Sequence, residues 1–158
     1  MYNHALRAHT PEDKKANFDL PYEEQNPFFG IEPALNDLVR LFNRVRYPSS
    51  MISVDEELIY LLGRCSVKQF IKDKHMRYGP KLFIGSGCNE GTKQKGYYHF
   101  AQLYRGKKRN RPGVFAGYGK GYEVVMEAII AMNLRWKGYW IFTDSWFTGL
   151  PLLLHTRI

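Results

Sequence analysis

Cysteine is scarce in this sequence. Only Cys65 and Cys88 occur among its 158 residues. Two cysteines are too few for the disulfide framework of a small secreted protein, and too few for a cysteine-based zinc cluster. We therefore expect both residues to be buried free thiols in a protein of a reducing compartment.

Long apolar runs are missing as well. No stretch of about 18 apolar residues, the minimum for a membrane-spanning helix, occurs in the chain. The first residues, Met1 to Arg7, contain no apolar signal core. The sequence thus predicts an intracellular protein with no membrane partner.

Acidic residues are nearly absent from the middle of the chain. The segment from Arg64 to Lys120 holds 14 basic residues and only two acidic ones, Asp73 and Glu90, a net charge of +12. The formal charge of the whole chain is +8. Such a block is typical of a surface that binds a polyanion, nucleic acid above all. A solvated basic face without a partner stays open as the alternative.

Two glycine-rich segments lack what a nucleotide-binding loop requires. Gly85–Gly96 is followed neither by Gly-Lys-Ser/Thr nor by a helix, which excludes a phosphate-binding loop. Gly117–Gly121 has no apolar strand directly before it, which excludes a dinucleotide fingerprint. His75 and His99 have no second ligand at metal spacing, so we expect surface or hydrogen-bonded histidines.

Four large apolar or aromatic residues, Tyr139–Phe142, run almost directly into Asp144. A continuous apolar run of this kind predicts a strand that is covered on both faces. Asp144 would lie where the strand leaves the core. Its carboxylate would cap a helix entering through Trp146 and Leu150, pair with a cation, or bind a metal.

A second acidic position lies within a predicted strand. Apolar residues at alternate positions from Ile52 to Leu62 indicate a long strand, but Asp55–Glu57 interrupt it. Three acids inside a strand repel one another and have poor strand propensity. A bound cation would offset this cost; a solvent-facing edge strand is the other explanation.

The order of elements predicts one α/β domain. Residues 1–27 are polar, contain Pro11, Pro21 and Pro27, and are expected to form a flexible arm. Residues 28–158 form the domain, with Phe28 docked on its core. The expected elements are a helix at 33–45, strands at 51–62, 82–84 and 97–104, a helix from about 122 to 130 and a strand at 139–142.

Three meandering strands, a crossover helix and a fourth strand make a mixed sheet. A right-handed crossover places the last strand parallel to the first. Asp55 and Asp144 would then lie on neighbouring strands, although 89 positions separate them. Two converging carboxylates form a hard-oxygen site of the type that suits Mg²⁺ or Mn²⁺.

Several segments together resemble the catalytic domain of piggyBac-type DNA transposases and their domesticated relatives. The resemblance covers about residues 28–158. It rests on Ser53-Val54-Asp55-Glu56-Glu57-Leu58, Gly63-Arg64, Tyr78-Gly79 with Lys81, Gly119-Lys120-Gly121 with Val124-Val125, and Asp144-Ser145-Trp146-Phe147-Thr148-Gly149-Leu150-Pro151.

The resemblance implies an RNase H-like fold that cleaves and joins DNA with a carboxylate triad and divalent metal. Asp55 resembles the first catalytic carboxylate and Asp144 the second, so both are the expected metal ligands. Arg64, Lys68 and Lys81 fall in the basic segment and are candidate DNA contacts. A nuclear location and a homodimer are further implications of the family.

The sequence departs from the family in ways that favour an inactive chain. Ser145 stands where the family usually has Asn, and Leu62 where it often has a basic residue. The family's third carboxylate lies far downstream of the second, beyond the reach of a chain that ends at Ile158. We therefore expect an incomplete sheet and no DNA cleavage by this chain alone. A domesticated, non-catalytic DNA-binding or chromatin-associated protein, and a basic RNA- or ligand-binding module, remain the alternatives.

Overall fold

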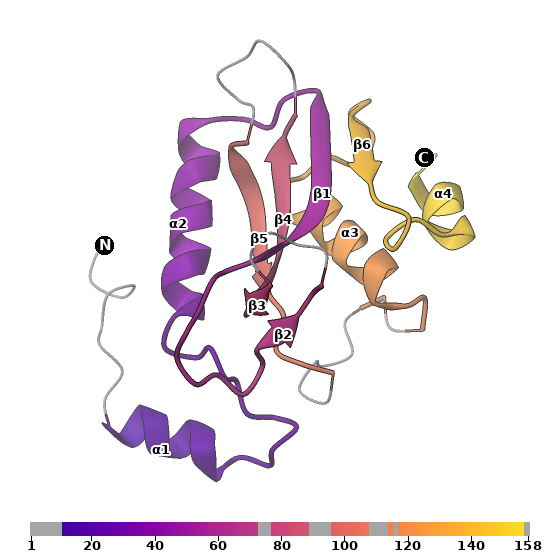
Figure 1. The fold of residues 1–158 in the computed structure, drawn as a ribbon. Helices are drawn as coiled ribbons and strands as arrows, with labels where there is room; N and C mark the ends of the chain where they lie inside the picture. Colours follow the sequence, from indigo (N-terminus) through magenta and orange to yellow (C-terminus); the bar gives the residue numbers. More distant parts are fainter. Residues whose placement is uncertain (1–10, 73–76, 89–95, 108–113, 116, 157–158) are drawn as a thin grey trace.

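The fold is a four-stranded mixed sheet with helices on both faces (Figure 1). It is seen in a computed structural model that describes residues 11–72, 77–88, 96–107, 114–115 and 117–156. Within these residues the helices are α1 (Pro11–Asp19), α2 (Glu32–Val45), α3 (Lys120–Ala131) and α4 (Leu150–Thr156). The strands are β1 (Met51–Leu58), β2 (Gln69–Phe70), β3 (Tyr78–Gly79), β4 (Lys81–Gly87), β5 (Tyr98–Leu103) and β6 (Trp140–Thr143).

The order of strands in the sheet is β5-β4-β1-β6. β1 pairs antiparallel with β4, and β4 pairs antiparallel with β5, which is the predicted meander. The chain then crosses over through α3, and β6 pairs parallel with β1. The predicted α/β class, the crossover and the parallel fourth strand are thus confirmed.

The sheet separates two apolar cores, because successive side chains of a strand point to opposite faces. On one face, Val54 and Phe83 pack with the buried side of α3, around Val125. On the other face, Leu82 packs with Val39 of α2. Neighbouring residues of β4 therefore belong to different cores, which fixes the register of the central strands.

The apolar stripe of α2 is only partly buried in the core. No residue of α2 is fully buried, and Leu38 and Val45 are 46% and 74% exposed. Leu35 and Val39 alone pack against the core of that face. The reason is that α2 lies over β5, the edge of the sheet, and so meets the sheet along a narrow strip.

The N-terminal arm contains a helix that the sequence did not predict. α1 begins at Pro11, which suits a first helical turn. Asn17 and Asn26 then exchange two hydrogen bonds, of 3.0 and 3.2 Å, and so hold the following segment against the end of α1. Phe28 is 6% exposed and docks on the core as predicted. Residues 1–10 lie outside the described part, and the flexibility of the arm stays a prediction.

The segment after β1 differs from the prediction in two respects. β1 ends at Leu58 rather than at Leu62, which is 81% exposed. Tyr78-Gly79, where no strand was predicted, forms β3, which pairs with β2 in a separate two-stranded sheet. A Cβ on Gly79 would lie 1.8 Å from the carbonyl oxygen of Ile59, so this close approach requires glycine.

The prediction that the apolar run 139–142 is covered on both faces is wrong. Within the described residues β6 is an edge strand, with Trp140 66% and Phe142 47% exposed. A run of large apolar residues indicates a strand, but it does not tell an edge strand from a central one.

Two smaller expectations were also tested. Cys65 and Cys88 are free thiols, but both are partly exposed rather than buried. None of the described helices is long and apolar enough to cross a membrane.

Candidate carboxylate site

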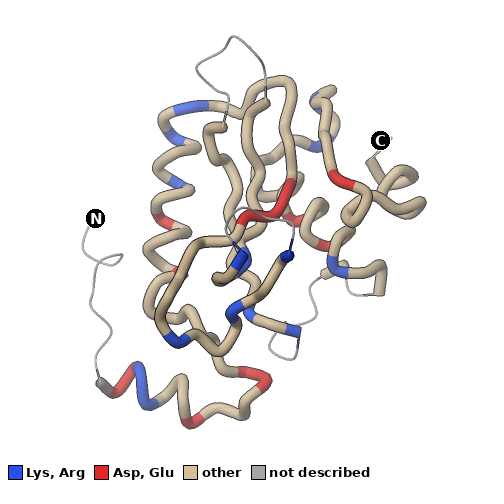
Figure 2. Tube along the Cα trace, in the orientation of Figure 1, with Lys and Arg blue, Asp and Glu red and all other residues tan. Residues whose placement is uncertain are grey.

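Asp55 and Asp144 directly follow the last residue pair of the parallel ladder. The register joins Val54 of β1 to Thr143 of β6, and the two aspartates come next on each strand. Neighbouring strands lie about 4.8 Å apart. Because Val54 points into the core of α3, alternation places Asp55 on the opposite face. Figure 2 shows the acidic stretch of β1 and the acidic position after β6 at the same end of the two strands.

Each carboxylate has one oxygen fixed by its own backbone. Asp55 Oδ1 accepts a 2.7 Å hydrogen bond from the amide of Glu56, and Asp144 Oδ1 accepts a 2.5 Å bond from the amide of Ser145. Both side chains are exposed, and neither forms an ion pair with any residue that the structure describes. The second oxygen of each carboxylate therefore faces solvent.

Asp144 does not cap a helix. The nearest helix, α4, begins six residues later, at Leu150. The Asp144 carbonyl instead accepts hydrogen bonds of 3.0 and 3.2 Å from the amides of Phe147 and Thr148 and closes a turn. The helix-capping alternative is thereby excluded.

The turn that follows Asp144 packs against the first turn of α3. A Cβ on Gly121 would lie 2.6 Å from the carbonyl oxygen of Trp146 and 3.0 Å from Cα of Phe147. Gly121 thus lets the backbone of α3 approach the turn that carries Asp144. The Gly-Lys-Gly segment and the Asp-Ser-Trp-Phe segment, which lie 25 residues apart in sequence, are parts of one packing unit.

The donor set fits one small divalent cation. Two carboxylates on adjacent strands offer hard oxygen ligands, which Mg²⁺ and Mn²⁺ prefer. No group of three or more His, Cys, Asp or Glu side chains that could hold a metal occurs in the described part of the chain. These residues therefore fit one ion held by two protein ligands and completed by water.

Glu57, two positions beyond Asp55, already has a partner. Tyr98 donates a 2.6 Å hydrogen bond from its hydroxyl to Glu57 Oε2. This bond, with burial and the nearby carboxylate charge, raises the pKa of Tyr98 to about 12. Glu57 is thus held toward β5 rather than toward Asp144.

The three candidate DNA contacts lie in different surroundings. The ammonium of Lys81 lies 5.3 Å from the ring centroid of Trp146, two residues beyond Asp144. Lys68 lies over the ring of Tyr78, at 5.8 Å. Arg64 is exposed, with no ion pair in the described residues. The structure thus brings Lys81 to the turn of Asp144, and Lys68 to the small β2–β3 sheet.

The rest of the basic segment is only partly described. Arg105, within the basic segment from Arg64 to Lys120, pairs with Glu32 of α2 and so contributes to the fold. Lys108 to Arg111 lie outside the described residues, as does His75. His99 is buried, with Nδ1 2.9 Å from Oδ1 of Asn43, in agreement with a hydrogen-bonded structural histidine.

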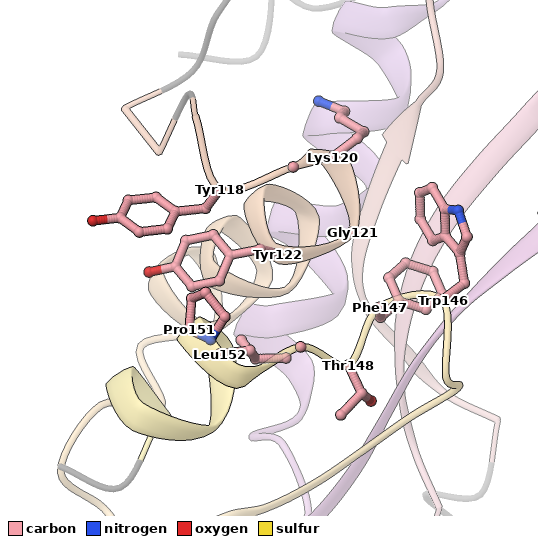
Figure 3. A pocket seen from close by; sticks show the side chains of 11 residues that line it. Tyr118, Lys120, Gly121, Tyr122, Trp146, Phe147, Thr148, Pro151 and Leu152 are labelled. Atoms are coloured by element: carbon pink, nitrogen blue, oxygen red, sulfur yellow. The ribbon is translucent and has the colours of Figure 1, made fainter.

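Sequence reasoning missed a cavity beside the turn of Asp144. Its volume is about 220 Å³, and Lys120, Trp146 and Thr148 contribute to its lining (Figure 3). Lys120 lies at the start of α3 and pairs with Glu123 at 3.3 Å. Trp146 is 51% exposed and stacks on Phe83 with a centroid distance of 6.1 Å. Its place two residues beyond a candidate carboxylate was the only signal in the sequence.

Comparison with known proteins decides the family. The family described as Transposase IS4 matches residues 4–155, nearly the whole chain. The chain belongs to this transposase family. Its likeness is to piggyBac-type members in particular, as the motifs around Asp55 and Asp144 indicated.

Two curated human relatives support this assignment. The chain is 32% identical over 127 residues to PiggyBac transposable element-derived protein 3 of Homo sapiens. The matched region covers 80% of the chain and 20% of that protein. It matches the human Chimeric ERCC6-PGBD3 protein with the same identity over 127 residues, 11% of that protein's length. This piggyBac-type chain thus spans about a fifth or less of these relatives.

A solved structure agrees with the sequence comparison. The chain is similar to a chain of the cryo-EM structure of the piggyBac transposase synaptic complex with hairpin DNA. The TM-score is 0.68 and the identity 25%, and the match covers 84% of this chain and 26% of the other. The fold of this transposase-family chain is therefore that of one part of the larger protein.

Proposed function

We propose that this chain is part of an RNase H-like transposase catalytic domain, in which Asp55 and Asp144 together bind a divalent metal ion. The observation that carries the proposal is the register of the parallel β1–β6 pair, whose last residue pair is followed by Asp55 within β1 and by Asp144 directly after β6. Family membership supports it, because a transposase acts on DNA phosphodiesters. The reaction class is DNA cleavage and strand transfer by carboxylates of the DDE or DDD type.

In this proposal the two aspartates bind metal and the basic residues bind DNA. Asp55 and Asp144 bind Mg²⁺ or Mn²⁺ through the oxygens that face solvent. The bound ion supplies Lewis-acid activation and offsets the charge that develops at the phosphate. Lys81 beside Trp146, with Arg64 and Lys68 further along, binds DNA phosphates and positions the strand. These contacts make DNA affinity fall steeply with salt, because binding releases condensed counterions.

The proposal includes the absence of useful cleavage by this chain alone. In two-metal phosphoryl transfer, ions about 3.5–4 Å apart act on the attacking and the leaving oxygens. The described residues supply two ligands and no group of three, so a second ion has no adequate site among them. A homodimer and a nuclear location are further parts of the proposal and derive from the family alone.

A domesticated, non-catalytic DNA-binding role is the second candidate function. The same observation favours it: two carboxylates without a third among the described residues are enough to bind an ion, but not to hold a pair of ions. In that role the sheet and the basic segment would bind DNA, and metal would contribute to stability only.

Nicking of supercoiled DNA tests the catalytic part of the proposal. With Mg²⁺ or Mn²⁺ present, the wild-type chain is expected to nick the plasmid no faster than the Asp55→Asn and Asp144→Asn variants. Metal-dependent nicking that both substitutions remove would contradict the expected inactivity, and would show that two carboxylates are sufficient. A nicking rate that neither substitution changes would instead point to a contaminating nuclease.

A further inference from the structure

The small β2–β3 sheet exposes two aromatic rings side by side. Phe70 and Tyr78 are directly paired across the two strands, and their ring centroids lie 4.8 Å apart at 35°. Phe70 is 55% exposed and Tyr78 52%. A two-stranded sheet is marginal by itself, and exposed rings add little to its stability. Their exposure calls for another explanation than core packing.

The described residues of the two segments that carry the rings have charge of one sign. Neither residues 58–72 nor residues 77–88 contain an aspartate or a glutamate. Lys72 and Arg77 are exposed at the end where the chain passes from β2 to β3, and Lys68 lies over the Tyr78 ring. Figure 2 shows basic positions along this part of the chain. A pair of rings framed by cations is complementary to a ligand that is both flat and anionic.

We propose that Phe70 and Tyr78 form a stacking platform for unpaired bases of single-stranded DNA, with Lys68, Lys72 and Arg77 binding its phosphates. Single-stranded DNA combines exposed base faces with a phosphate charge at every nucleotide, which is the pairing of features that the platform offers. Duplex DNA keeps its bases stacked inside the helix and cannot use the rings. The choice of DNA as the polyanion rests on the function proposed above.

The platform is anchored to the strand that carries Asp55. The amide of Ile59, directly after β1, donates a 3.0 Å hydrogen bond to the carbonyl of Pro80, directly after β3. Gly79 packs its backbone against the Ile59 carbonyl. A second bond of 3.0 Å runs from the amide of Ile71 to the carbonyl of Arg77 and extends the ladder. Single-stranded DNA bound by the rings would therefore contact a small sheet that is hydrogen-bonded to the end of β1, the β-strand of the proposed metal site.

Binding to normal and abasic oligonucleotides isolates the stacking contribution. The full 158-residue chain would be titrated, in EDTA, against fluorescein-labelled single-stranded DNA and an abasic strand of the same length, with fluorescence anisotropy as the readout. Both strands carry the same phosphates, so the difference in affinity measures the bases. One stacked base contributes roughly 5- to 150-fold, and we expect the wild type to prefer the normal strand by about tenfold or more.

The variants are chosen to separate the ring from the fold. Phe70→Ile keeps an apolar residue of high strand propensity but removes the ring, and should lose most of the preference for the normal strand. Phe70→Trp should restore it. Tyr47→Ile removes an aromatic side chain that is 85% exposed elsewhere, and should leave the preference unchanged. Circular dichroism would confirm that each variant is folded.

Several results would overturn the platform. Equal affinity of the wild type for the normal and abasic strands would do so, as would a Phe70→Ile variant that keeps the preference. Tighter binding of single-stranded RNA than of single-stranded DNA would also overturn it, because the proposal commits to DNA. Because no metal is present, the outcome does not depend on metal binding by Asp55 and Asp144.

Discussion

His99 carries a titratable ring into the interior beneath α2. The side chain is 1% exposed. The side-chain amide of Asn43 makes two hydrogen bonds with His99. Its Oδ1 lies 2.9 Å from the ring Nδ1, and its Nδ2 donates a 2.8 Å bond to the His99 carbonyl. Since Asn43 Oδ1 accepts, the ring Nδ1 donates. Nε2 has no protein partner within the described residues.

The pH dependence of stability should report this burial. Burial lowers the pKa of His99 from its ordinary 6.5. Below about pH 6.5 the unfolded chain therefore binds a proton at His99 that the folded chain does not bind, so the free energy of unfolding falls as the pH falls. In His99→Gln this part of the pH dependence should disappear. Urea unfolding from about pH 7.5 to about pH 5 would measure it, and a variant that keeps the wild-type slope would contradict the assignment.

At the scale of elements, the docking of β3 on the end of β1 depends on one glycine. A Cβ at Gly79 would lie 1.8 Å from the Ile59 oxygen and 2.7 Å from the Ile59 carbonyl carbon. Both are backbone atoms, which cannot move aside as the end of a flexible side chain can. The β2–β3 sheet would have to leave β1.

Gly79→Ala should consequently destabilise the fold, by about 1–3 kcal/mol or more, the usual cost of overpacking. Gly63→Ala is the matched control, because a Cβ there would meet only Leu61 Cδ1 at 3.9 Å, and we expect a change within about 0.5 kcal/mol. Chemical denaturation of the two variants measures both effects. Equal unfolding midpoints would show that β3 does not dock as described.

The larger elements could be predicted from sequence, and the smaller ones could not. Alternating apolar residues located β1 and β5, and helical spacing located α3, because each is long enough to show a period. β2 and β3 have two residues each, too few for any period. The exposure of β6 was missed because large apolar side chains look the same at the edge of a sheet and at its centre.

At the candidate site, sequence reasoning found the carboxylates but not their surroundings. Asp55 and Asp144 stood out because an acid within or after an apolar strand is costly. The contact of Lys81 with Trp146 joins positions 65 residues apart in the chain. The packing of the Asp144 turn against Gly121 likewise depends on the backbone geometry of two elements. Such contacts follow from the fold and have no local signal.

For the whole molecule, the two proposed sites lie on β1 and on the segment that directly follows it. The parallel β1–β6 pair presents two carboxylates, and the segment that follows β1 supplies cations and exposed aromatic rings. Under the proposed function, both features would act on DNA. The account as a whole therefore depends on whether Asp55 and Asp144 bind one ion together.

Mn²⁺ binding to the intact chain, followed by electron paramagnetic resonance of the free ion, tests this most directly. The wild type is expected to bind one ion. Asp55→Asn and Asp144→Asn should each weaken binding by roughly tenfold or more, because each removes one of two charged ligands. The double variant should be little worse than either single one. Asp37→Asn, on exposed α2 and paired with Arg40 at 3.2 Å, should bind as the wild type does. Undiminished Mn²⁺ binding by both site variants would contradict the shared site.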